Sequence, residues 1–593
     1  MPPWSVGHCA QLCVDALEME EPLPQDIREQ HGLPTFAEAM RMRHVPHARA
    51  EVGFARRRFA YDEALAMQIV LGQRRRAARA GVAVPRTAAS GGLLSRFDER
   101  LPFELTPGQQ EAGREIAADL ACEQPMNRLL QGEVGSGKTL VALRAMLAVV
   151  DAGGQCALLA PTEVLAAQHH RSITGLLGDL AEAGLLGGDA GGTRVTLLTG
   201  SMSTAARKKA MLEAASGEAG IVVGTHSLIQ DKVSFAALGL VVVDEQHRFG
   251  VEQRDALSDK ATGQPHLLVM TATPIPRTVA MTVFGDMDVS TMRELPPGRA
   301  PIATHVVDNP RWYERAWSRV AEEVAAGHQA YVVCPRIDSG GQETDGADLL
   351  TGYDGDGDDA DGFAAGEECA LFGPEHTASA RDPREEFVIS DLSAVDDVAA
   401  EITARPEFAG VRVGVLHGRL PAEEKDAVMT AFAAGEIDVL VSTTVIEVGV
   451  DVPNATVMVV MNADRYGVSQ LHQLRGRVGR GSAPGLCLLV TRTQVESAER
   501  RVRAVAELTD GFALADIDLA ERREGDILGA RQSGGRSTLR VLRLSHDAQI
   551  IDSARADAAA LLDEDPSLDG HARLRDMVLR MVDDEAAEFL TRG

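Results

Sequence analysis

Short apolar runs that alternate with helix-like segments, in two separate series, constrain the fold of this 593-residue chain most strongly. Most of these runs have the length of a β-strand, and strands that alternate with helices are typical of a parallel sheet covered on both faces. We therefore expect an α/β protein with two tandem parallel-sheet lobes that share one architecture. The runs of the first lobe are residues 129–130, 156–160, 195–198, 221–223, 240–243 and 267–270, and those of the second are 330–334, 411–416, 439–441, 457–460 and 486–490.

The remaining segments complete a four-domain organisation. Residues 1–100 are helical by pattern, with their clearest amphipathic stretch at 56–68 and a linker at 81–92. We expect the first lobe at 101–299, closed by a Pro-Pro-Gly linker, the second at 300–492, and a mixed C-terminal region with helices at 493–593. Residues 338–380 hold 12 acidic residues and no Lys or Arg, which predicts a disordered acidic insertion over 338–385 of the second lobe.

The charge of the chain is strongly acidic, but it is unevenly distributed. The formal net charge of −28 argues against a polyanion-binding surface that covers the whole protein. By contrast, residues 41–80 hold 10 arginines and 3 acidic residues. This stretch is either a solvated helix face or a face directed at phosphates, and the sequence leaves both interpretations open.

Composition also bears on the compartment. No apolar run approaches the length of a membrane span, and Gln11, Asp15 and Glu18 interrupt the only candidate for a signal peptide. The seven cysteines are scattered, odd in number and without a repeated pair spacing. These features predict a reduced cytosol rather than a secreted, disulfide-bonded protein.

The segment Gly-Glu-Val-Gly-Ser-Gly-Lys-Thr at 132–139 has the pattern of a phosphate-binding loop. An apolar strand precedes it and a helical pattern follows it, which is the context that such a loop requires. Glycines let the backbone turn its N–H groups toward phosphate oxygens at the positive end of a helix dipole. Lys138 is expected to reach the β- and γ-phosphates of ATP, and Thr139 to bind Mg²⁺. The predicted phosphate contacts are Gly132, Gly135, Ser136, Gly137, Lys138 and Thr139.

A carboxylate pair follows an apolar strand of the same lobe. Asp244 ends the run at 240–243, and Glu245 comes next. The ends of parallel strands meet at one edge of the sheet, so Asp244 is expected beside the phosphate loop. There Asp244 can hold Mg²⁺ and Glu245 can orient and deprotonate the attacking water. A simple turn carboxylate would account for Asp244 alone, but not for the pair.

An arginine cluster lies on the second lobe, at residues 473–480. We expect Gln473, Arg477 and Arg480 to act on a nucleotide held by the first lobe, where an arginine stabilises the transferring charge. A solvated arginine-rich helix is the alternative. Gly476 and Gly479 argue against an ordinary exposed helix, because glycine is a poor helix former.

Together these motifs resemble the superfamily 2 helicases, and within them the RecG family of bacterial ATP-dependent DNA helicases. The similarity extends over segments 102–109, 160–169, 224–230, 244–254, 271–278, 416–419, 442–451, 470–481 and 510–534. It implies two RecA-like lobes that use ATP and Mg²⁺ to translocate on double-stranded DNA. It also implies 3′→5′ unwinding and the remodelling of stalled forks and Holliday junctions in recombination and repair.

The resemblance assigns further residues. Phe103 and Gln109 match the adenine-reading segment, and Gly449 and Asp451 match nucleotide contacts of the second lobe. The residues implied in DNA contact or in coupling are Thr162, Thr225, His226, Thr271, Thr273, His417, Arg419, Thr443, Thr444, Arg522, Arg531 and Gln532. It further implies a monomer in the bacterial cytoplasm, associated with the nucleoid, with single-strand-binding protein as a partner.

Two departures from the family pattern carry expectations of their own. Arg523 and Glu524 replace residues that would shape a Gly-Pro turn in the coupling loop, so the geometry of that loop is open. The family begins with an OB-fold wedge domain that splits DNA, whereas residues 1–100 are expected to be only the helical segment that follows it. A form without the wedge is expected to keep DNA-stimulated ATP hydrolysis but to unwind forks poorly.

Three other functions remain as alternatives. A relative of the transcription-repair coupling factor shares the coupling loop, but it should carry a polymerase-binding module. A degenerate ATP-bound clamp or DNA-binding remnant fits poorly with intact Lys138, Asp244, Glu245 and Arg480. A small-molecule kinase has no need of a second lobe.

Overall fold

The computed structural model describes most of the chain in two compact units, 1–297 with 510–593, and 298–509. Each unit is described by itself. The described residues are 3–184, 188–189, 191–228, 233–244, 264–271, 274–276, 279, 285, 287–294, 301–337, 393–444, 452–481, 483–493, 495–521, 540–544 and 546–581. The acidic insertion expected at 338–385 lies outside them.

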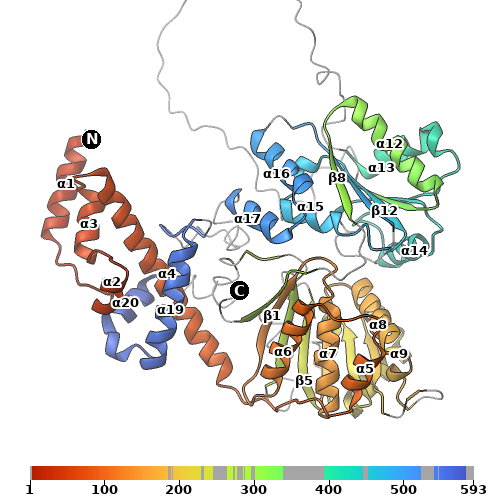
Figure 1. The fold of residues 1–593 in the computed structure, drawn as a ribbon, viewed down its shortest axis with the longest axis horizontal. Coiled ribbons are helices and arrows are strands. Elements are labelled where there is room, and N and C mark those ends of the chain that lie inside the picture. The colour runs from red at the N-terminus through yellow and green to blue at the C-terminus, as the bar shows by residue number, and fades with distance from the viewer. Residues whose placement is uncertain are drawn as a thin grey trace, which may run out of the picture. The chain divides into compact units, whose positions relative to one another are not determined.

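The first unit is built around a seven-stranded parallel sheet in the order β3-β4-β2-β5-β6-β1-β7 (Figure 1). Helices cover both faces of this sheet. Alternate residues of each strand point to opposite faces, so each strand contacts helices on both sides. On β2, the Cys156 thiol donates to the carbonyl of Met146 in helix α7, while Ala157 lies in a core shared with α9. The strands are β1 Asn127–Gly132, β2 Gln155–Leu159, β3 Arg194–Leu198, β4 Ala219–Gly224, β5 Leu238–Asp244, β6 His266–Thr271 and β7 Asp288–Met292.

Helices connect these strands in the order of the chain. The helices of this lobe are α5 Leu93–Arg100, α6 Pro107–Leu120, α7 Lys138–Asp151, α8 Glu163–Leu177 and α9 Thr204–Ser216, and the short 3₁₀ helices are η1 Gly178–Ala181 and η2 His226–Leu228. Helix α7 is buried over most of its length because its sequence is almost wholly apolar.

The second unit contains a six-stranded parallel sheet in the order β10-β11-β9-β12-β13-β8. Its strands are β8 Ile302–Val307, β9 Gln329–Val333, β10 Val413–Leu416, β11 Val439–Ser442, β12 Ala455–Val460 and β13 Gly485–Val490. Its helices are α12 Pro310–Ala325, α13 Val395–Ala404, η5 Pro406–Phe408, α14 Ala422–Ala433, η7 Ala463–Arg465, α15 Val468–Arg475 and α16 Glu496–Glu507. Trp317 of α12 and Phe408 pack edge to face in the core on one side of this sheet.

The prediction of two parallel-sheet lobes with helices around them is confirmed. The apolar runs all correspond to strands, but β7 and β8 were missed. Both are edge strands. An edge strand packs against one neighbour only, so β7 and β8 are partly exposed and carry Asp, Ser, Thr and His among their apolar residues.

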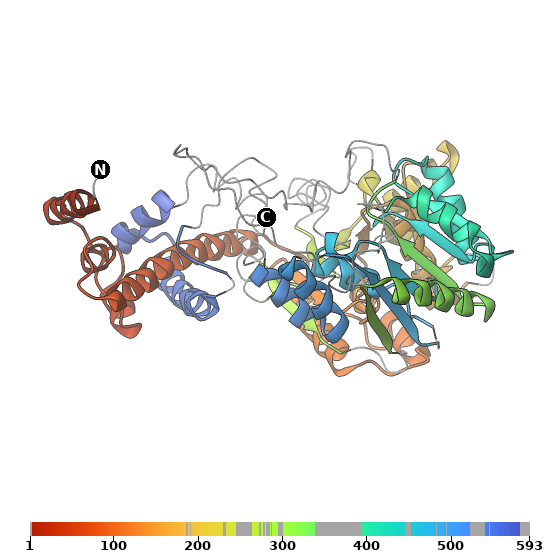
Figure 2. The same cartoon turned by 90° about the horizontal axis from the view of Figure 1, so that it is seen from above.

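The two ends of the chain form one helical cluster in the first unit. It consists of α1 Pro3–Ala16, α2 Gln25–Gln30, α3 Phe36–His44 and α4 Arg49–Arg79, with α19 Ala548–Glu564, η8 Asp569–His571 and α20 Ala572–Met581. Leu65 and Ile69 of α4 share a core with Ile551 and Leu562 of α19. Figure 2 shows the long helix α4 lying against the C-terminal helices. The expected helical character of the first hundred residues is confirmed.

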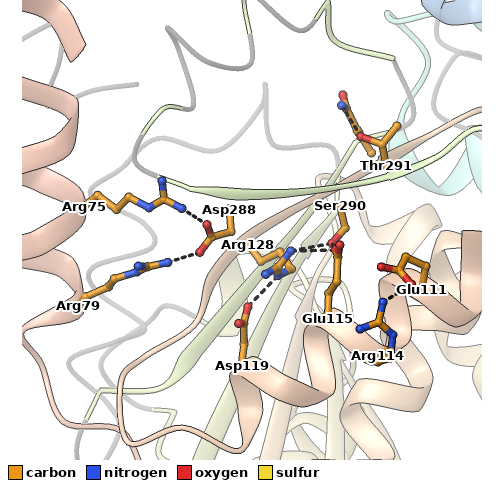
Figure 3. Close-up of polar contacts among 11 residues, drawn as sticks. Arg75, Arg79, Glu111, Arg114, Glu115, Asp119, Arg128, Asp288, Ser290 and Thr291 are labelled. Atoms are coloured by element: carbon orange, nitrogen blue, oxygen red, sulfur yellow. Dashed lines mark hydrogen bonds and ion pairs between the residues drawn. The ribbon is translucent and has the colours of Figure 1, made fainter. Parts of the chain in front are cut away.

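The arginine-rich stretch at 41–80 has a role that neither sequence interpretation included. At least six of its ten arginines form ion pairs within the unit. Arg58 is fully buried between Asp62 and Glu21, and a buried charge is tolerated only when it is paired. Arg75 and Arg79 both bind Asp288 of β7, so they join α4 to the edge of the sheet (Figure 3).

Among the described residues, no helix combines the length and the apolar character that a membrane crossing requires.

Candidate active site

The phosphate loop lies between β1 and α7, at the carboxyl edge of the first sheet. Gly135 and Gly137 both have φ of 84°, a left-handed conformation that L side chains rarely adopt. Gly137 is also the N-cap of α7, and it offers no side chain to the first amides of that helix. An anion can therefore bind these amides, since no side-chain cap competes with it.

Two side chains of the loop are arranged around its backbone. The Lys138 ammonium donates to the carbonyl oxygens of Gly132 at 2.8 Å and Glu133 at 2.9 Å, so it folds back over the loop. The hydroxyl of Ser136 is buried and has no hydrogen-bond partner among the described residues. A phosphate oxygen would satisfy that hydroxyl, and it would offer the ammonium a stronger partner than a carbonyl.

Helix α6 is fastened to this loop by Gln109. The amide of Gln109 donates to the carbonyl of Ser136 at 2.8 Å, and its oxygen accepts from the backbone of Thr106. Gln109 is thus buried and shapes the loop directly. A Cβ added to Gly137 would lie 2.4 Å from the Gln109 nitrogen, so it would displace the Gln109 amide as well as strain the backbone. Phe103 is about half exposed, in the segment that leads into α6.

Asp244 ends β5 at the same edge of the sheet. In the register of the sheet, Asp244 pairs with Met270 of β6, and Met270 pairs with Leu130 of β1, two residues before the loop. Asp244 therefore lies at the same edge of the sheet as the phosphate loop, with β6 between their two strands. Its neighbour Glu245 lies outside the described residues.

The residues at this edge fit a magnesium ion that also binds phosphate. Mg²⁺ prefers oxygen ligands and is usually held by one or two carboxylates together with phosphate oxygens. Asp244 provides a carboxylate and Thr139 a hydroxyl. The described part of the chain has no cluster of three or more His, Cys, Asp or Glu residues that could hold a metal alone.

Sequence reasoning missed His169, which contacts Asp244. The Nε2 of His169, on α8, lies 2.7 Å from Oδ2 of Asp244, and both residues are largely buried. This contact joins α8 to the strand end. The adjacent His170 faces elsewhere, toward the carbonyl of Val195, and burial lowers its pKa. The adjacent histidines of α8 were the available signal, although the sequence does not say which one faces the carboxylate.

Gln131 was also missed. It directly precedes the phosphate loop, and it joins three segments of the first unit. Its amide nitrogen donates to Thr291 of β7, and its oxygen accepts from the backbone of Ile275. Next to Thr291 on β7, the Ser290 hydroxyl accepts a hydrogen bond from Arg128, which also pairs with Glu115 and Asp119 (Figure 3).

In the second unit, the arginine segment divides into buried and partly exposed residues. Arg475 is buried and donates to the carbonyls of Val505, Leu508 and Thr509, so it fastens α15 to the end of α16. By contrast, Gln473, Arg477 and Arg480 are partly exposed. The segment is therefore not a uniformly solvated arginine helix.

Gly479 ends this segment with a sharp turn. Its φ is 67°, and a Cβ there would lie 3.0 Å from Ile302 of β8. The glycine therefore serves both the backbone conformation and the close approach to the edge strand. This turn separates Arg480 from α15.

The predicted DNA-contacting residues lie at strand ends of both units. Thr162 caps α8 by accepting from the backbone of Leu165, Thr225 is buried and His226 is exposed, and Thr271 is buried at the end of β6. In the second unit, His417, Thr443 and Thr444 are partly exposed and Arg419 is exposed. The predicted site residues Thr273, Gly449, Asp451, Arg522, Arg531 and Gln532 lie outside the described residues.

Comparison with protein families gives three matches along the chain. The model described as DEAD/DEAH box helicase matches residues 106–282, and the helicase conserved C-terminal domain matches 388–482. The model of domain 3, C-terminal, of the ATP-dependent DNA helicase RecG matches 508–582.

Individual relatives extend the similarity to the whole chain. The ATP-dependent DNA helicase RecG of Mycobacterium leprae is 50% identical over 601 residues, which cover 100% of this chain and 75% of that protein. The RecG of Bacillus subtilis is 41% identical and covers 95% of this chain and 74% of its own length. A solved structure of RecG bound to a three-way DNA junction is 34% identical, with a TM-score of 0.65, and the match covers 93% of this chain and 65% of that one.

Proposed function

This chain belongs to the RecG family of ATP-dependent DNA helicases, and from that premise we propose that it uses ATP to translocate on and remodel branched double-stranded DNA. The observation that supports this most directly is the shared edge of the first sheet, where the loop at 132–139 and Asp244 lie together. The match to the C-terminal domain of RecG favours this function over that of a transcription-repair coupling factor.

In this proposal the first lobe binds the triphosphate. The amides of the loop and of the first turn of α7 bind the phosphates, and Lys138 turns from the two carbonyls toward the β- and γ-phosphates. Asp244 and Thr139 would hold Mg²⁺, which neutralises charge on the phosphates. Glu245 orients the attacking water and accepts its proton.

The second lobe contributes positive charge to the reaction. We propose that Arg477 and Arg480 stabilise the γ-phosphoryl group during transfer, with Gln473 beside them. A nucleotide bound by both lobes favours a closed arrangement, and hydrolysis removes that preference. Gly449 and Asp451 are assigned to the same nucleotide, as are Phe103 and Gln109 on the first lobe.

DNA contact in this proposal is made to the sugar-phosphate backbone at the strand ends of both lobes. The chemistry of Thr162, His226, Arg419 and Thr443 suits phosphate oxygens, so affinity should depend on salt and little on sequence. The proposed substrates are forks and Holliday junctions, with 3′→5′ polarity. We further propose that the protein acts as a monomer in the bacterial cytoplasm, at the nucleoid, with single-strand-binding protein as a partner.

The test is ATP hydrolysis by the purified chain with a three-way junction, with single-stranded DNA and without DNA. The proposal expects stimulation by the junction and a loss of at least about 1000-fold in turnover for Lys138→Ala, since Lys138 contacts the transferring phosphates. The matched control is Lys209→Ala, because Lys209 is largely exposed on α9. Equal hydrolysis by wild type and Lys138→Ala would contradict the proposal.

A further inference from the structure

One side chain of the phosphate loop binds a helix far away in the sequence. Oε1 of Glu133 accepts a hydrogen bond from the backbone N–H of Gly511 at 2.5 Å, across 378 residues. Gly511 is the first residue of helix α17 (Gly511–Glu521). The next amide, that of Phe512, donates to the side chain of Asp510. Glu133 therefore serves as a remote cap for α17, at the helix end where a negative charge is stabilising.

The main chain of Glu133 is tied to Lys138. Its carbonyl accepts from the Lys138 ammonium at 2.9 Å and from the backbone of Ser136 at 3.0 Å. The same residue thus contacts the lysine through its backbone and α17 through its carboxylate. Glu133 is only 7% exposed, so little solvent separates the two contacts.

Helix α17 also contacts other parts of the first unit. Arg293 directly follows β7, and its guanidinium lies 4.8 Å from the centre of the Phe512 ring. Near the other end of α17, Leu519 belongs to the apolar core of the helical cluster, together with residues of α4 and α19. The helix therefore bridges the phosphate loop and the helical cluster, and it lies in the segment 510–534, which resembles the hairpin and loop that couple hydrolysis to translocation in the family.

We propose that Glu133 is a positioning residue that transmits the occupancy of the phosphate loop to α17. This inference rests on the proposed function, since it requires a triphosphate in the loop. When Lys138 turns toward the phosphates, the carbonyls of Gly132 and Glu133 lose its hydrogen bonds, and the Glu133 carbonyl keeps its bond to the backbone of Ser136. The carboxylate then carries that change to the first turn of α17.

The first experiment measures coupling rather than hydrolysis alone. The readout is the amount of third strand displaced from a DNA triplex per ATP hydrolysed, which corrects for any change in turnover. For Glu133→Ala we expect this ratio to fall at least tenfold. Glu133→Gln keeps an acceptor oxygen and should retain more coupling. Glu111→Gln, which removes an exposed carboxylate from α6, is the matched control with an unchanged ratio.

A second variant removes the donor instead of the acceptor. Gly511→Pro deletes the N–H that Glu133 binds, and proline is well tolerated at the first position of a helix. The same loss of coupling is expected. A normal ratio in both Glu133→Ala and Gly511→Pro would overturn the proposal.

Hydrogen exchange separates signalling from simple stabilisation. In the wild type, a non-hydrolysable ATP analogue should change the exchange rates of the amides at the start of α17 at least fivefold. In Glu133→Ala these rates should no longer depend on the nucleotide, although the analogue still binds. The proposal would also be overturned if the exchange rates of the α17 amides in the wild type were the same with and without the ATP analogue. Absence of DNA-stimulated hydrolysis in the wild type would instead contradict the proposed function.

Discussion

The sheets of the two lobes have the same strand order, yet only the first carries a phosphate loop. The order β3-β4-β2-β5-β6-β1 of the first lobe is repeated by β10-β11-β9-β12-β13-β8 in the second, and the first lobe adds β7 at its edge. Strand β8 therefore occupies the position of β1. The two strands can therefore be compared directly, together with the turns that follow them.

The difference lies in the turn after the equivalent strands. In the first lobe, residues 133–137 connect β1 to α7, and the N-cap Gly137 has no side chain. In the second lobe, residues 308–309 connect β8 to α12, and the N-cap Asn309 accepts a hydrogen bond from the backbone of Trp312. Since the helix N-terminus of the second lobe is satisfied by its own side chain, its first turn is a poorer anion site.

Other positions are used alike in the two lobes. The predicted DNA-contacting residue Thr225 follows β4, and Thr443 follows β11, which are equivalent strands. Both lobes therefore carry a predicted DNA-contacting residue after this strand, whereas the phosphate loop belongs to the first lobe. This division of roles leads us to expect effects of decreasing size at Arg480, Arg475, His169 and Asn309.

The largest effect is expected at Arg480, which we propose acts on the transferring phosphate. Arg480→Ala should lower DNA-stimulated ATP turnover about 1000-fold, because an arginine that stabilises transferring phosphate contributes that much to the rate. Steady-state hydrolysis with junction DNA measures it. Arg480→Lys should not restore the rate, since an ammonium lacks the planar fork of a guanidinium. Turnover within threefold of wild type in Arg480→Ala would assign the second lobe to DNA binding alone.

The neighbouring Arg475 should act on stability instead. Arg475→Met removes a buried guanidinium that donates to three carbonyls, which should destabilise the second unit by about 3 kcal/mol. Thiol labelling in urea, measured by the mass of each cysteine-containing peptide, reports the unfolding of each lobe separately. Cys334 belongs to the second unit and Cys156 to the first, and burial raises the pKa of both thiols.

Labelling of Cys334 should begin at a lower urea concentration in Arg475→Met, with Cys156 unchanged. Arg503→Met is the control, since Arg503 is exposed and pairs with Glu499 on the surface of α16. An equal shift for Cys156 and Cys334 would show that the two units do not unfold independently.

A smaller effect is expected at His169, on the first lobe. His169→Ala removes a side chain that contacts Asp244, the proposed Mg²⁺ ligand. Residues that orient a metal ligand typically contribute 10- to 100-fold, so we expect a loss of about 30-fold in turnover. The half-saturating Mg²⁺ concentration should rise in parallel. His170→Ala is the matched control on the same helix. An unchanged Mg²⁺ requirement in His169→Ala would mean that the contact serves only packing.

The smallest effect is expected at the turn of the second lobe that replaces the phosphate loop. Asn309→Ala deletes the N-cap of α12 and should cost about 1 kcal/mol of stability in the second unit. The affinity for a fluorescent ATP analogue, measured by titration, should not change. A weaker affinity in Asn309→Ala would show that this turn also binds nucleotide, and the contrast between the lobes would fail.

The sequence alone was sufficient to predict the elements that are specified by residues close together in the chain. Buried parallel strands require continuous apolar runs, so the central strands were predicted with their order along the chain. The loop at 132–139 could also be recognised, because its glycines and Lys138 lie within one short segment of the sequence. Strands β7 and β8 were not predicted, because these two edge strands carry polar residues among their apolar ones, whereas the edge strands β3 and β10 lie on apolar runs.

Only the tertiary structure decided which side chains meet. Arg475, Arg477 and Arg480 look alike in the sequence, yet one is buried against α16 and the other two are partly exposed. His169 meets Asp244 across 75 residues, and Glu133 meets Gly511 across 378. Local periodicity specifies which face of an element is apolar, but a polar contact between distant elements depends on how those faces pack. For that reason the sequence determined the fold and the phosphate loop of this protein, and the packing decided the residues that connect them.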